Sequence, residues 1–339
     1  MFNEYCKTNK AVFLEYYFDG RKHSFFKKLF GSETRDVFNG KIITAGLFRI
    51  IPLLTTLKPD IIHLLTFERF AVFFYIYKLF FKVKIFYNSH GVIYYENSIL
   101  KSSSMLYTLK DRFCEKIYLK FSDRIIFPSE ITLDLAEKFY KISENKVLIL
   151  PNLINSRFFN VKNRVYSENE LKAVFIYKNV LNRSGADLLK EILKKDISNI
   201  KYYIITDEND INLPDSVNPV DIMKILPNEE LPDFYSDKDI FLSLNNYDTF
   251  SISTGEAMAA GLIPVITEQT GISRFIENGI NGFKFNYNDT GKPAIILEQL
   301  TKMNESDRKK ISLSASESIA EISAENVMEI YKTEYKASI

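Results

Sequence analysis

The chain has 339 residues, 46% of them hydrophobic and 26% charged, enough to bury a large core in about two domains. Cys6 and Cys114 are too few for a disulfide framework, and with only three histidines they offer no cluster of metal ligands. The N-terminus carries no apolar signal segment, and the most apolar stretch, residues 70–86, is broken by three lysines. Composition therefore excludes a disulfide-rich secreted fold and a bilayer-spanning helix. It predicts a cytoplasmic protein that holds neither a metal nor a cofactor.

The formal net charge of +1 conceals two oppositely charged halves. Residues 1–155 carry 23 Lys and Arg against 15 Asp and Glu, a balance of +8, and the remainder carries 21 against 28, a balance of −7. A basic half can contact anionic lipid or a phosphorylated acceptor, which predicts peripheral association with the inner face of a cell membrane. Attraction between the two halves explains the same asymmetry. No nucleic-acid-binding module is recognisable, so nucleic acid is not an expected partner.

Short apolar runs alternate with longer amphipathic stretches, which is typical of strand–helix–strand units in a parallel sheet. In the first half, runs rich in Ile, Val, Phe or Leu predict strands at 11–17, 61–65, 85–88, 124–128 and 147–150. Helical spacing predicts helices at 47–57 and 104–121. The second of these has an apolar stripe with basic residues between its members, which are Leu106, Leu109, Phe113, Ile117 and Phe121. Residues 24–30 join aromatic residues to two lysines and fit either a membrane-docking segment or core packing.

The polar run at 160–169 has no apolar period and is interpreted as an interdomain linker. A second alternating series follows, with strands predicted at 171–177, 201–206, 240–244 and 263–267 and helices at 185–194 and 254–260. The sequence therefore predicts an α/β protein with two Rossmann-like domains, residues 1–155 and 156–323. Ligands of open α/β sheets bind beyond the carboxyl ends of the strands, so we expect the two domains to face each other across a binding cleft.

Candidate site residues are concentrated between positions 239 and 285. Asp248 follows a predicted strand, and Glu256 lies eight residues later, in or near the first turn of a predicted helix. The N–H groups and the partial positive charge of a helix N-terminus can hold a diphosphate. A carboxylate beside them can accept hydrogen bonds from two neighbouring sugar hydroxyls. The alternative for Glu256 is an ordinary glutamate that is favoured by the helix dipole.

This segment resembles the signature of glycosyltransferase family 4, retaining enzymes of the GT-B fold that include bacterial cell-surface polysaccharide glycosyltransferases. The signature has an acidic residue, seven residues and Glu-Ala-Met-Ala-x-Gly-x-Pro-Val, which match Asp248, Glu256 and the residues after it. The resemblance implies that Glu256 holds the ribose hydroxyls of a nucleotide and that Asp248 contacts the transferred sugar. It also implies that N–H groups of Phe250, Ser251 and Ile252 line the sugar-phosphate pocket. The family usually has Glu in place of Asp248, so the donor sits closer or a different sugar is bound.

Two basic residues match family positions that grip the donor diphosphate. The family has Gly-Arg at the end of a strand and Lys-Gly at the start of the next helix. This chain has Lys178 and Arg183 at these places, so the two cations are exchanged. The resemblance implies that both cations stabilise the charge that develops on the leaving diphosphate, in place of a metal ion. Two solvated loop cations are the alternative interpretation.

Family members also carry a histidine in the loop after a strand of the first domain, where it faces the donor sugar. His90 occupies that loop, directly after the strand predicted at 85–88. His63 lies within a predicted strand and is expected to pack in the core. Ser129 matches a recurring family serine or caps a helix. The resemblance further implies that the final helix, within residues 324–339, returns to the first domain.

These expectations combine into one function. The chain would transfer a sugar from a nucleotide-sugar donor, with a UDP-sugar expected, to a hydroxyl of a glycan or lipid-linked acceptor in surface polysaccharide synthesis. The anomeric configuration would be retained. A non-catalytic relative that binds nucleotide sugars or scaffolds an enzyme complex is the alternative, because Asp248, the exchanged cations and a reduced Gly-rich loop at 18–21 depart from the family pattern. A sugar-nucleotide epimerase of the same fold is a second alternative.

Overall fold

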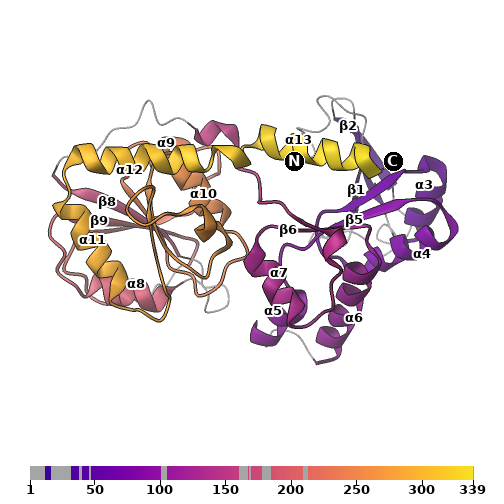
Figure 1. The fold of residues 1–339 in the computed structure, drawn as a ribbon, viewed down its shortest axis with the longest axis horizontal. Coiled ribbons are helices and arrows are strands. Elements are labelled where there is room, and N and C mark those ends of the chain that lie inside the picture. Colours follow the sequence, from indigo (N-terminus) through magenta and orange to yellow (C-terminus); the bar gives the residue numbers. More distant parts are fainter. Residues whose placement is uncertain are drawn as a thin grey trace. The chain divides into compact units, whose positions relative to one another are not determined.

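The structure is a computed structural model that describes residues 12–16, 32–37, 40–45, 47–100, 105–159, 167, 169–177, 185–208 and 213–338. The chain forms two compact units (Figure 1). Unit 1 comprises residues 1–127, 135–150 and 324–339, and unit 2 comprises residues 128–134 and 151–323. The short segment 128–134 belongs to unit 2, although the residues before it and after it in the chain belong to unit 1. Residues 18–30 and most of the expected linker at 160–169 lie outside the described residues.

The core of unit 1 is a four-stranded parallel sheet in the order β4-β5-β6-β7. Its strands are β4 (Ile61–Leu64), β5 (Lys84–Asn88), β6 (Arg124–Phe127) and β7 (Val147–Ile149). All four coincide with predicted strands. Ile85, Phe86 and Ile125 are completely buried because helices cover the sheet, which is why these strands are continuous apolar runs.

A separate three-stranded sheet in unit 1 has the order β1-β3-β2. β1 (Val12–Tyr16) pairs in parallel with β3 (Gly40–Ala45), and β3 pairs antiparallel with β2 (Ser32–Val37). The sequence predicts only β1. The polar run Ser-Glu-Thr-Arg-Asp in β2 has no apolar strand pattern, although the sequence Asn39-Gly40, which leads into β3, is a hairpin signal.

The helices of unit 1 follow the strands along the chain. Those described are η1 (Leu47–Arg49), α3 (Ile50–Leu57), η2 (Arg69–Ala71), α4 (Val72–Phe80), α5 (Ile93–Leu100), α6 (Met105–Phe121), η3 (Glu144–Lys146) and α13 (Ala324–Ser338). Helix α7 (Glu130–Glu137) is divided between the units, with residues 130–134 in unit 2 and 135–137 in unit 1. Helix α13 packs on the parallel sheet: Arg124 Nε of β6 donates to Glu334 Oε2 at 3.0 Å. The final helix thus lies in unit 1, far in sequence from the rest of that unit.

Helix α6 is present as predicted, but its apolar stripe is not its buried side. Leu106 and Phe113 are 62% and 64% exposed, and Leu109 and Phe121 are exposed as well. The buried side instead holds two carboxylates together with apolar residues: Asp111, Cys114, Glu115, Tyr118 and Leu119. The spacing therefore identifies the helix but not its orientation, because both sides of α6 carry apolar residues at helical intervals.

Unit 2 is built on a six-stranded parallel sheet in the order β10-β9-β8-β11-β12-β13. The strands are β8 (Leu171–Ile176), β9 (Ile200–Thr206), β10 (Val220–Lys224), β11 (Ile240–Ser243), β12 (Ile263–Thr267) and β13 (Phe283–Phe285). The four central strands coincide with predicted strands, whereas the edge strands β10 and β13 were not predicted. An edge strand is covered less by the rest of the protein, so its sequence can be shorter or more polar than that of a central strand, and its apolar pattern is weaker.

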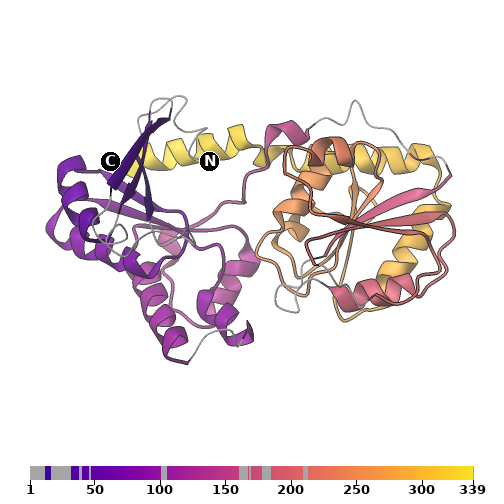
Figure 2. The same ribbon diagram turned by 180° about the vertical axis from the view of Figure 1, so that it is seen from behind.

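Helices cover both faces of this sheet (Figure 2). α8 (Ala186–Leu193) and α11 (Lys292–Lys302) bury their apolar sides in one core with alternate residues of the strands. α9 (Leu231–Tyr235), α10 (Ile252–Ala259) and α12 (Glu305–Ser318) lie on the opposite face, where α10 and α12 contact each other and β12. The described part of unit 2 also contains the short helices η4 (Ser156–Phe158), η6 (Gly271–Phe275) and η7 (Ala320–Ile322). Parallel strands with helices on both faces confirm the predicted α/β class.

Candidate functional site

The loop between β11 and α10 is organised by the carboxylate of Asp248. Asp248 Oδ1 accepts the backbone N–H groups of Phe250 at 3.1 Å and Ser251 at 3.0 Å. Its second oxygen, Oδ2, accepts from Asn245 Nδ2 at 3.1 Å. The structure thus brings three predicted site residues together. Two of the N–H groups that were expected to line a sugar-phosphate pocket donate here to Asp248.

The same loop is held from outside by residues far away in the sequence. The carbonyl oxygen of Thr249 accepts hydrogen bonds from Ser129 Oγ at 2.7 Å and from Thr132 Oγ1 at 3.2 Å. Gly271, at the start of η6, packs so closely that an added Cβ would lie 2.2 Å from Thr249 O. Ser129 also accepts from the backbone N–H of Thr132 at 3.3 Å, so it caps α7 as well as anchoring the loop. The sequence identified Ser129 as a candidate but did not reveal its contact with this loop.

Helix α10 begins at Ile252, two residues earlier than predicted, so Glu256 lies just beyond its first turn. The N-cap residue, Ser251, has φ 73°, a left-handed conformation that is uncommon for a residue other than glycine. Its hydroxyl hydrogen-bonds to Thr254 Oγ1 at 2.8 Å. Phe250 is buried, whereas Ile252 is exposed. A turn that is held in an unusual conformation presents the first N–H groups of α10, which have no partner within the helix.

Glu256 is half-buried on α10 and has a partner that the sequence did not suggest. Asn228 Nδ2, in the segment between β10 and α9, donates to Glu256 Oε1 at 3.2 Å. The nearby Tyr235 hydroxyl is buried, and burial and then the charge of Glu256 raise the pKa of Tyr235 far above its ordinary value. The hydrogen bond from Asn228 therefore orients the Glu256 carboxylate on α10.

A second loop of unit 2, between β8 and α8, meets the first one. Gly185, the N-cap of α8, has φ 68°. A Cβ at this position would lie 2.0 Å from the carbonyl oxygen of Leu244, the residue directly after β11. Only glycine fits this left-handed conformation and close approach. Lys178 and Arg183 lie between β8 and Gly185 in the chain, outside the described residues, so the structure shows the contact of Gly185 with the residue after β11 and leaves both cations undescribed.

His90 lies in unit 1, exposed in the loop after β5. Desolvation by neighbouring protein atoms lowers the pKa of His90 below its ordinary value, and a hydrogen bond with the Leu65 backbone opposes this effect. The preceding Ser89 is buried, and its N–H donates to the carbonyl of Ile126 on β6 at 2.8 Å. His90 is therefore neutral near pH 7 and stands at the carboxyl end of the parallel sheet, the usual position of ligand-binding loops.

His63 packs in the core of unit 1, as predicted. Its Nε2 hydrogen-bonds to Asn88 Oδ1 at 2.8 Å, and its Nδ1 hydrogen-bonds to the hydroxyl of Tyr335 on α13. Asn88 Nδ2 in turn donates to the hydroxyl of Tyr331 at 3.1 Å. Burial lowers the pKa of His63 to about 4. This histidine joins β4, β5 and α13 and has a structural role.

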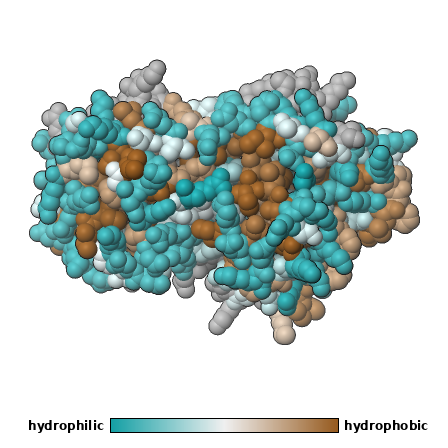
Figure 3. All heavy atoms as spheres, in the orientation of Figure 1, coloured by the Kyte–Doolittle hydropathy of each residue, from teal (hydrophilic) through white to brown (hydrophobic). Residues whose placement is uncertain are grey.

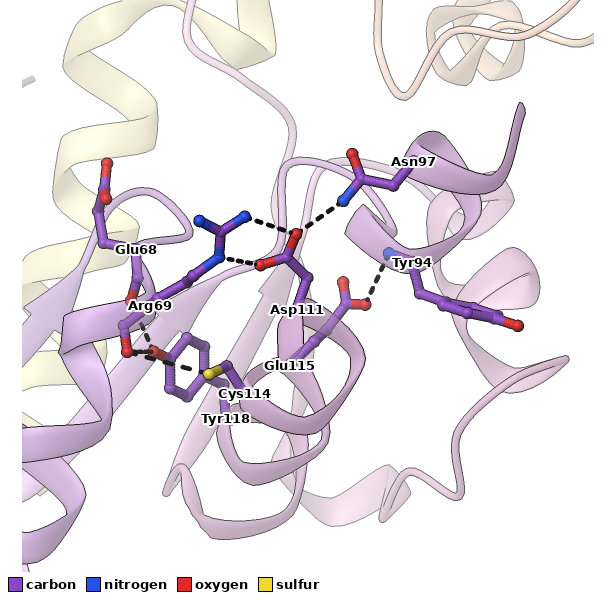
Figure 4. A network of polar contacts seen from close by, with 8 residues as sticks. All are labelled: Glu68, Arg69, Tyr94, Asn97, Asp111, Cys114, Glu115 and Tyr118. Atoms are coloured by element: carbon purple, nitrogen blue, oxygen red, sulfur yellow. Dashed lines mark hydrogen bonds and ion pairs between the residues drawn. The ribbon is translucent and has the colours of Figure 1, made fainter. Parts of the chain in front are cut away.

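Unit 1 also contains a pocket of about 470 Å³ that the sequence did not reveal. The aromatic residues Phe67 and Phe70 and the polar residues Arg69, Asn97 and Asp111 line it. Asp111 is only 2% exposed, and its carboxylate accepts from Arg69 Nη2 at 3.0 Å and from Asn97 Nδ2 at 2.9 Å (Figure 4). Aromatic faces beside a fixed polar network form a surface that suits a hydroxyl-rich ligand.

A neighbouring carboxylate on the same helix fixes one wall of this pocket. Glu115 is buried and accepts the N–H groups of the first two residues of α5, Ile93 at 2.8 Å and Tyr94 at 3.2 Å. Figure 4 shows the bond from Tyr94. The hydroxyl of Tyr140 donates to the same carboxylate at 2.6 Å. Burial raises the pKa of Glu115 above its ordinary value. Both acidic residues of α6 therefore lie on its buried side, Asp111 at the pocket and Glu115 under α5.

Two further properties of the described residues bear on function. No cluster of three or more His, Cys, Asp or Glu side chains in this part of the chain could hold a metal ion. Likewise, no described helix has both the length and the apolar character needed to cross a membrane.

Sequence comparison matches two family models, one to each half of the chain. Residues 29–158 match the family described as Glycosyltransferase Family 4, and residues 160–316 match the family described as Glycosyl transferases group 1. A protein of Klebsiella pneumoniae, described as an uncharacterized 41.2 kDa protein in the cps region, is 24% identical over 197 residues. That match covers 56% of this chain, and it spans only 55% of the length of the Klebsiella protein.

Solved structures of glycosyltransferases share the fold of this chain. A glycosyltransferase from Rickettsia africae matches with a TM-score of 0.67 and 16% identity over 86% of this chain and 80% of its own. HepE of Anabaena, solved in complex with UDP-glucose, matches with a TM-score of 0.68 and 13% identity over 96% of this chain and 99% of its own. Sucrose-phosphate synthase from Thermosynechococcus elongatus gives a TM-score of 0.72 at 12% identity, over 96% and 89% of the two chains. At these identities the likeness shows the fold.

Proposed function

Because the chain belongs to glycosyltransferase family 4 and has the GT-B fold, we propose that it transfers a sugar from a nucleotide-sugar donor to a hydroxyl of a glycan or lipid-linked acceptor. The observation that carries this proposal is the loop before α10. There an acidic residue, a strained turn and a helix N-terminus lie side by side in unit 2, and Glu256 follows on the same helix. The product would be a surface polysaccharide, in keeping with the relative from the cps region of Klebsiella pneumoniae.

The donor half of the proposal assigns a role to each part of this loop. Glu256 accepts hydrogen bonds from the ribose hydroxyls, and Asp248 holds the turn and meets the donor sugar. The N–H groups at the start of α10, that of Ile252 among them, face the diphosphate, since a helix N-terminus favours an anion. Lys178 and Arg183 add positive charge from the adjoining loop and take the place of a metal ion. HepE was solved with UDP-glucose, which supports a UDP-sugar as the donor class here.

The reaction breaks the bond between the anomeric carbon and the diphosphate oxygen and forms a bond from that carbon to the acceptor oxygen. The proton of the acceptor hydroxyl leaves with the nucleoside diphosphate, so charge and atoms balance. We assign retention of the anomeric configuration because the family signature in this chain is that of retaining enzymes. His90 is neutral near pH 7 and can donate a hydrogen bond to a sugar hydroxyl.

The acceptor half of the proposal places the acceptor in the pocket of unit 1. Phe67 and Phe70 offer aromatic faces, and the paired Arg69 and Asp111 offer fixed polar groups. Arg69 is half exposed, so its guanidinium can also meet a phosphate of a lipid-linked acceptor. The enzyme would act in the cytoplasm, at the inner face of the cell membrane.

A non-catalytic relative that binds nucleotide sugars is the second candidate, and one observation favours it. Asp248 accepts the N–H groups of Phe250 and Ser251, so part of the expected sugar-phosphate pocket is already satisfied within the loop. Such a protein would bind the donor without releasing nucleoside diphosphate when acceptor is added.

Thermal unfolding in the presence of UDP, GDP, ADP and their sugar conjugates tests the donor site. A ligand at 100 times its dissociation constant stabilises the folded state by about 2.7 kcal/mol, which raises the melting temperature of a domain of this size by roughly 5–10 °C. We expect one nucleotide series to do so with the wild type and with Glu298→Gln, a surface control on α11, but not with Glu256→Gln. No shift with any series would refute the donor site. A shift without nucleotide release in the presence of acceptor glycans would favour the non-catalytic candidate.

A further inference from the structure

Helix α4 of unit 1 exposes large apolar side chains at its C-terminal end. Leu79 and Phe80 are 80% and 77% exposed, and Ile76 and Phe73, about one and two turns earlier, are exposed as well. The helix contains no acidic residue, and Lys82 and Lys84 follow it on the surface. Exposed apolar residues on this scale are unusual on a surface that faces only water.

Helix α6 shows the same combination on its outer side. Its exposed apolar residues are Met105, Leu106, Tyr107, Leu109, Phe113 and Phe121. The exposed charges between them are all basic: Lys110, Arg112, Lys116 and Lys120. The two acidic residues of the helix are buried on the opposite side, where they bind other parts of unit 1. Burial of both acids leaves an outer side that is apolar and purely cationic.

The two helices are in contact. Lys78 Nζ of α4 donates to the carbonyl oxygen of Phe121, the last residue of α6, at 3.0 Å. Asp123, directly beyond α6, forms an ion pair with Lys78 and lies 3.6 Å from Lys84 Nζ. It offsets the charge of these two lysines and not that of Lys82 or of the basic residues of α6. Figure 3 shows apolar surface over the side of unit 1 that α3 and α4 form and at the end of α6. We call the exposed residues of α4 and α6, together with Phe81 and Lys82, the α4–α6 surface.

We propose that the α4–α6 surface docks unit 1 on an anionic lipid bilayer. Leu and Phe side chains can enter the boundary between headgroups and acyl chains, while lysines beside them attract anionic headgroups. A second copy of this chain is a poorer occupant, because a symmetric contact would set the lysines of α6 against one another. No described helix could cross the membrane, so this contact would be peripheral.

The pocket of unit 1 gives this docking a purpose that rests on the proposed function. Arg69 and Phe70 line the pocket immediately before α4, and Asp111 reaches it from α6. The helices that would touch the bilayer therefore also form the pocket walls. A lipid-linked acceptor could keep its lipid in the membrane while its polar head enters the pocket. The acceptor class inferred from this arrangement is a phosphorylated lipid carrying a hydroxyl-rich headgroup.

Co-sedimentation of the full chain with vesicles tests the proposal. One set contains phosphatidylcholine alone, and the other contains phosphatidylcholine with phosphatidylglycerol. We expect binding to the anionic set only, weakened at about 1 M NaCl, where the screening length falls to about 3 Å. The double variant Phe80→Glu with Phe113→Glu should partition at least about tenfold more weakly. Ile295→Glu, which changes an equally exposed apolar residue on α11 of unit 2, should bind like the wild type.

Three results would overturn the proposal. They are absence of binding to anionic vesicles, equal binding of the double variant, and a concentration-dependent dimer that the double variant abolishes while vesicle binding is absent. Melting curves of both variants serve as the control for folding. Stabilisation by nucleotides, measured on the same samples, separates this question from the donor site. A double variant that still responds to nucleotide but no longer binds vesicles supports the surface, and a wild type that binds vesicles without any nucleotide response refutes only the proposed function.

Discussion

The loop before α10 depends on one carboxylate, so Asp248→Ala is the sharpest single test of the site. The substitution removes the acceptor for the N–H groups of Phe250 and Ser251 and for the side-chain amide of Asn245. Phe250 and Ser251 are buried, and their N–H groups lose their acceptor within the loop. Ser251 also keeps its unusual φ of 73° only while its surroundings enforce it. We expect the loop to relax and the start of α10 to lose its geometry.

The size of the effect follows from these contacts. A hydrogen bond to a charged group contributes about 1.5–3 kcal/mol, and a buried donor left without a partner costs about 1–3 kcal/mol. Asp248 is only half-buried, so water can replace part of what is lost. We therefore expect Asp248→Ala to lower the free energy of unfolding of unit 2 by about 3 kcal/mol, or roughly 6–12 °C in its melting temperature. Asp248→Asn keeps one oxygen that can accept both N–H groups and should cost about 1 kcal/mol.

The assay is thermal unfolding of both variants, with calorimetric titration of the nucleotide that stabilises the wild type. Asp248→Ala should bind this nucleotide at least about tenfold more weakly, because the turn that presents the N-terminus of α10 is no longer held. Each kcal/mol of lost stability lowers the melting temperature by about 2 °C or more. If Asp248→Ala melts within about 2 °C of the wild type, the carboxylate does not organise the loop. Our reading of the site would then be refuted.

Three further substitutions test other parts of the structure. The pKa of His63 is about 4 in the folded protein and ordinarily 6.5, so folding favours the neutral imidazole. The contribution of His63 to the free energy of unfolding is therefore fully present above pH 6.5, and it falls by about 3 kcal/mol as the pH decreases towards 4. His63→Gln should remove this part of the difference in free energy of unfolding between urea titrations at pH 4.5 and at pH 8. A difference as large as that of the wild type would contradict this prediction. Gly185→Ala places a Cβ 2.0 Å from a backbone oxygen at φ 68° and should cost about 2 kcal/mol or more, whereas Gly291→Ala, with open space around it, should leave the melting temperature unchanged within about 1 °C. Ser129→Ala removes the 2.7 Å hydrogen bond to Thr249 O, so it should lower the free energy of unfolding by about 1 kcal/mol and weaken nucleotide binding. Scanning calorimetry with and without nucleotide would detect both effects. Nucleotide binding equal to that of the wild type would show that this hydrogen bond does not support the site.

Local pattern was sufficient for the central strands of both sheets and for the main helices. Parallel strands that are covered on both faces must be short, continuous apolar runs, and β5, β6, β11 and β12 are all of this kind. Less covered elements escaped prediction for the same physical reason. β2 is polar and β10 lies at a sheet edge, so neither needs the composition that makes a strand recognisable.

The candidate site divides in the same way. The spacing from Asp248 to Glu256 was visible in the sequence because a strand, a turn and a helix start must follow one another along the chain. The contacts of Thr249 with Ser129 could not be anticipated, since they join segments 120 positions apart. The roles of Lys178, Arg183 and His90 remain predictions.

By itself, the sequence determined the α/β class, the family signature and the position of the acidic loop, because each depends on residues that are close together in the chain. Only the tertiary structure decided which side of α6 is buried. Both sides of that helix carry apolar residues at helical spacing, and the buried one also holds Asp111 and Glu115. The partners of these carboxylates, Arg69 and Tyr140, come from elsewhere in the chain and offset the cost of burying charge. That long-range pairing leaves the apolar and basic residues of α6 on the surface.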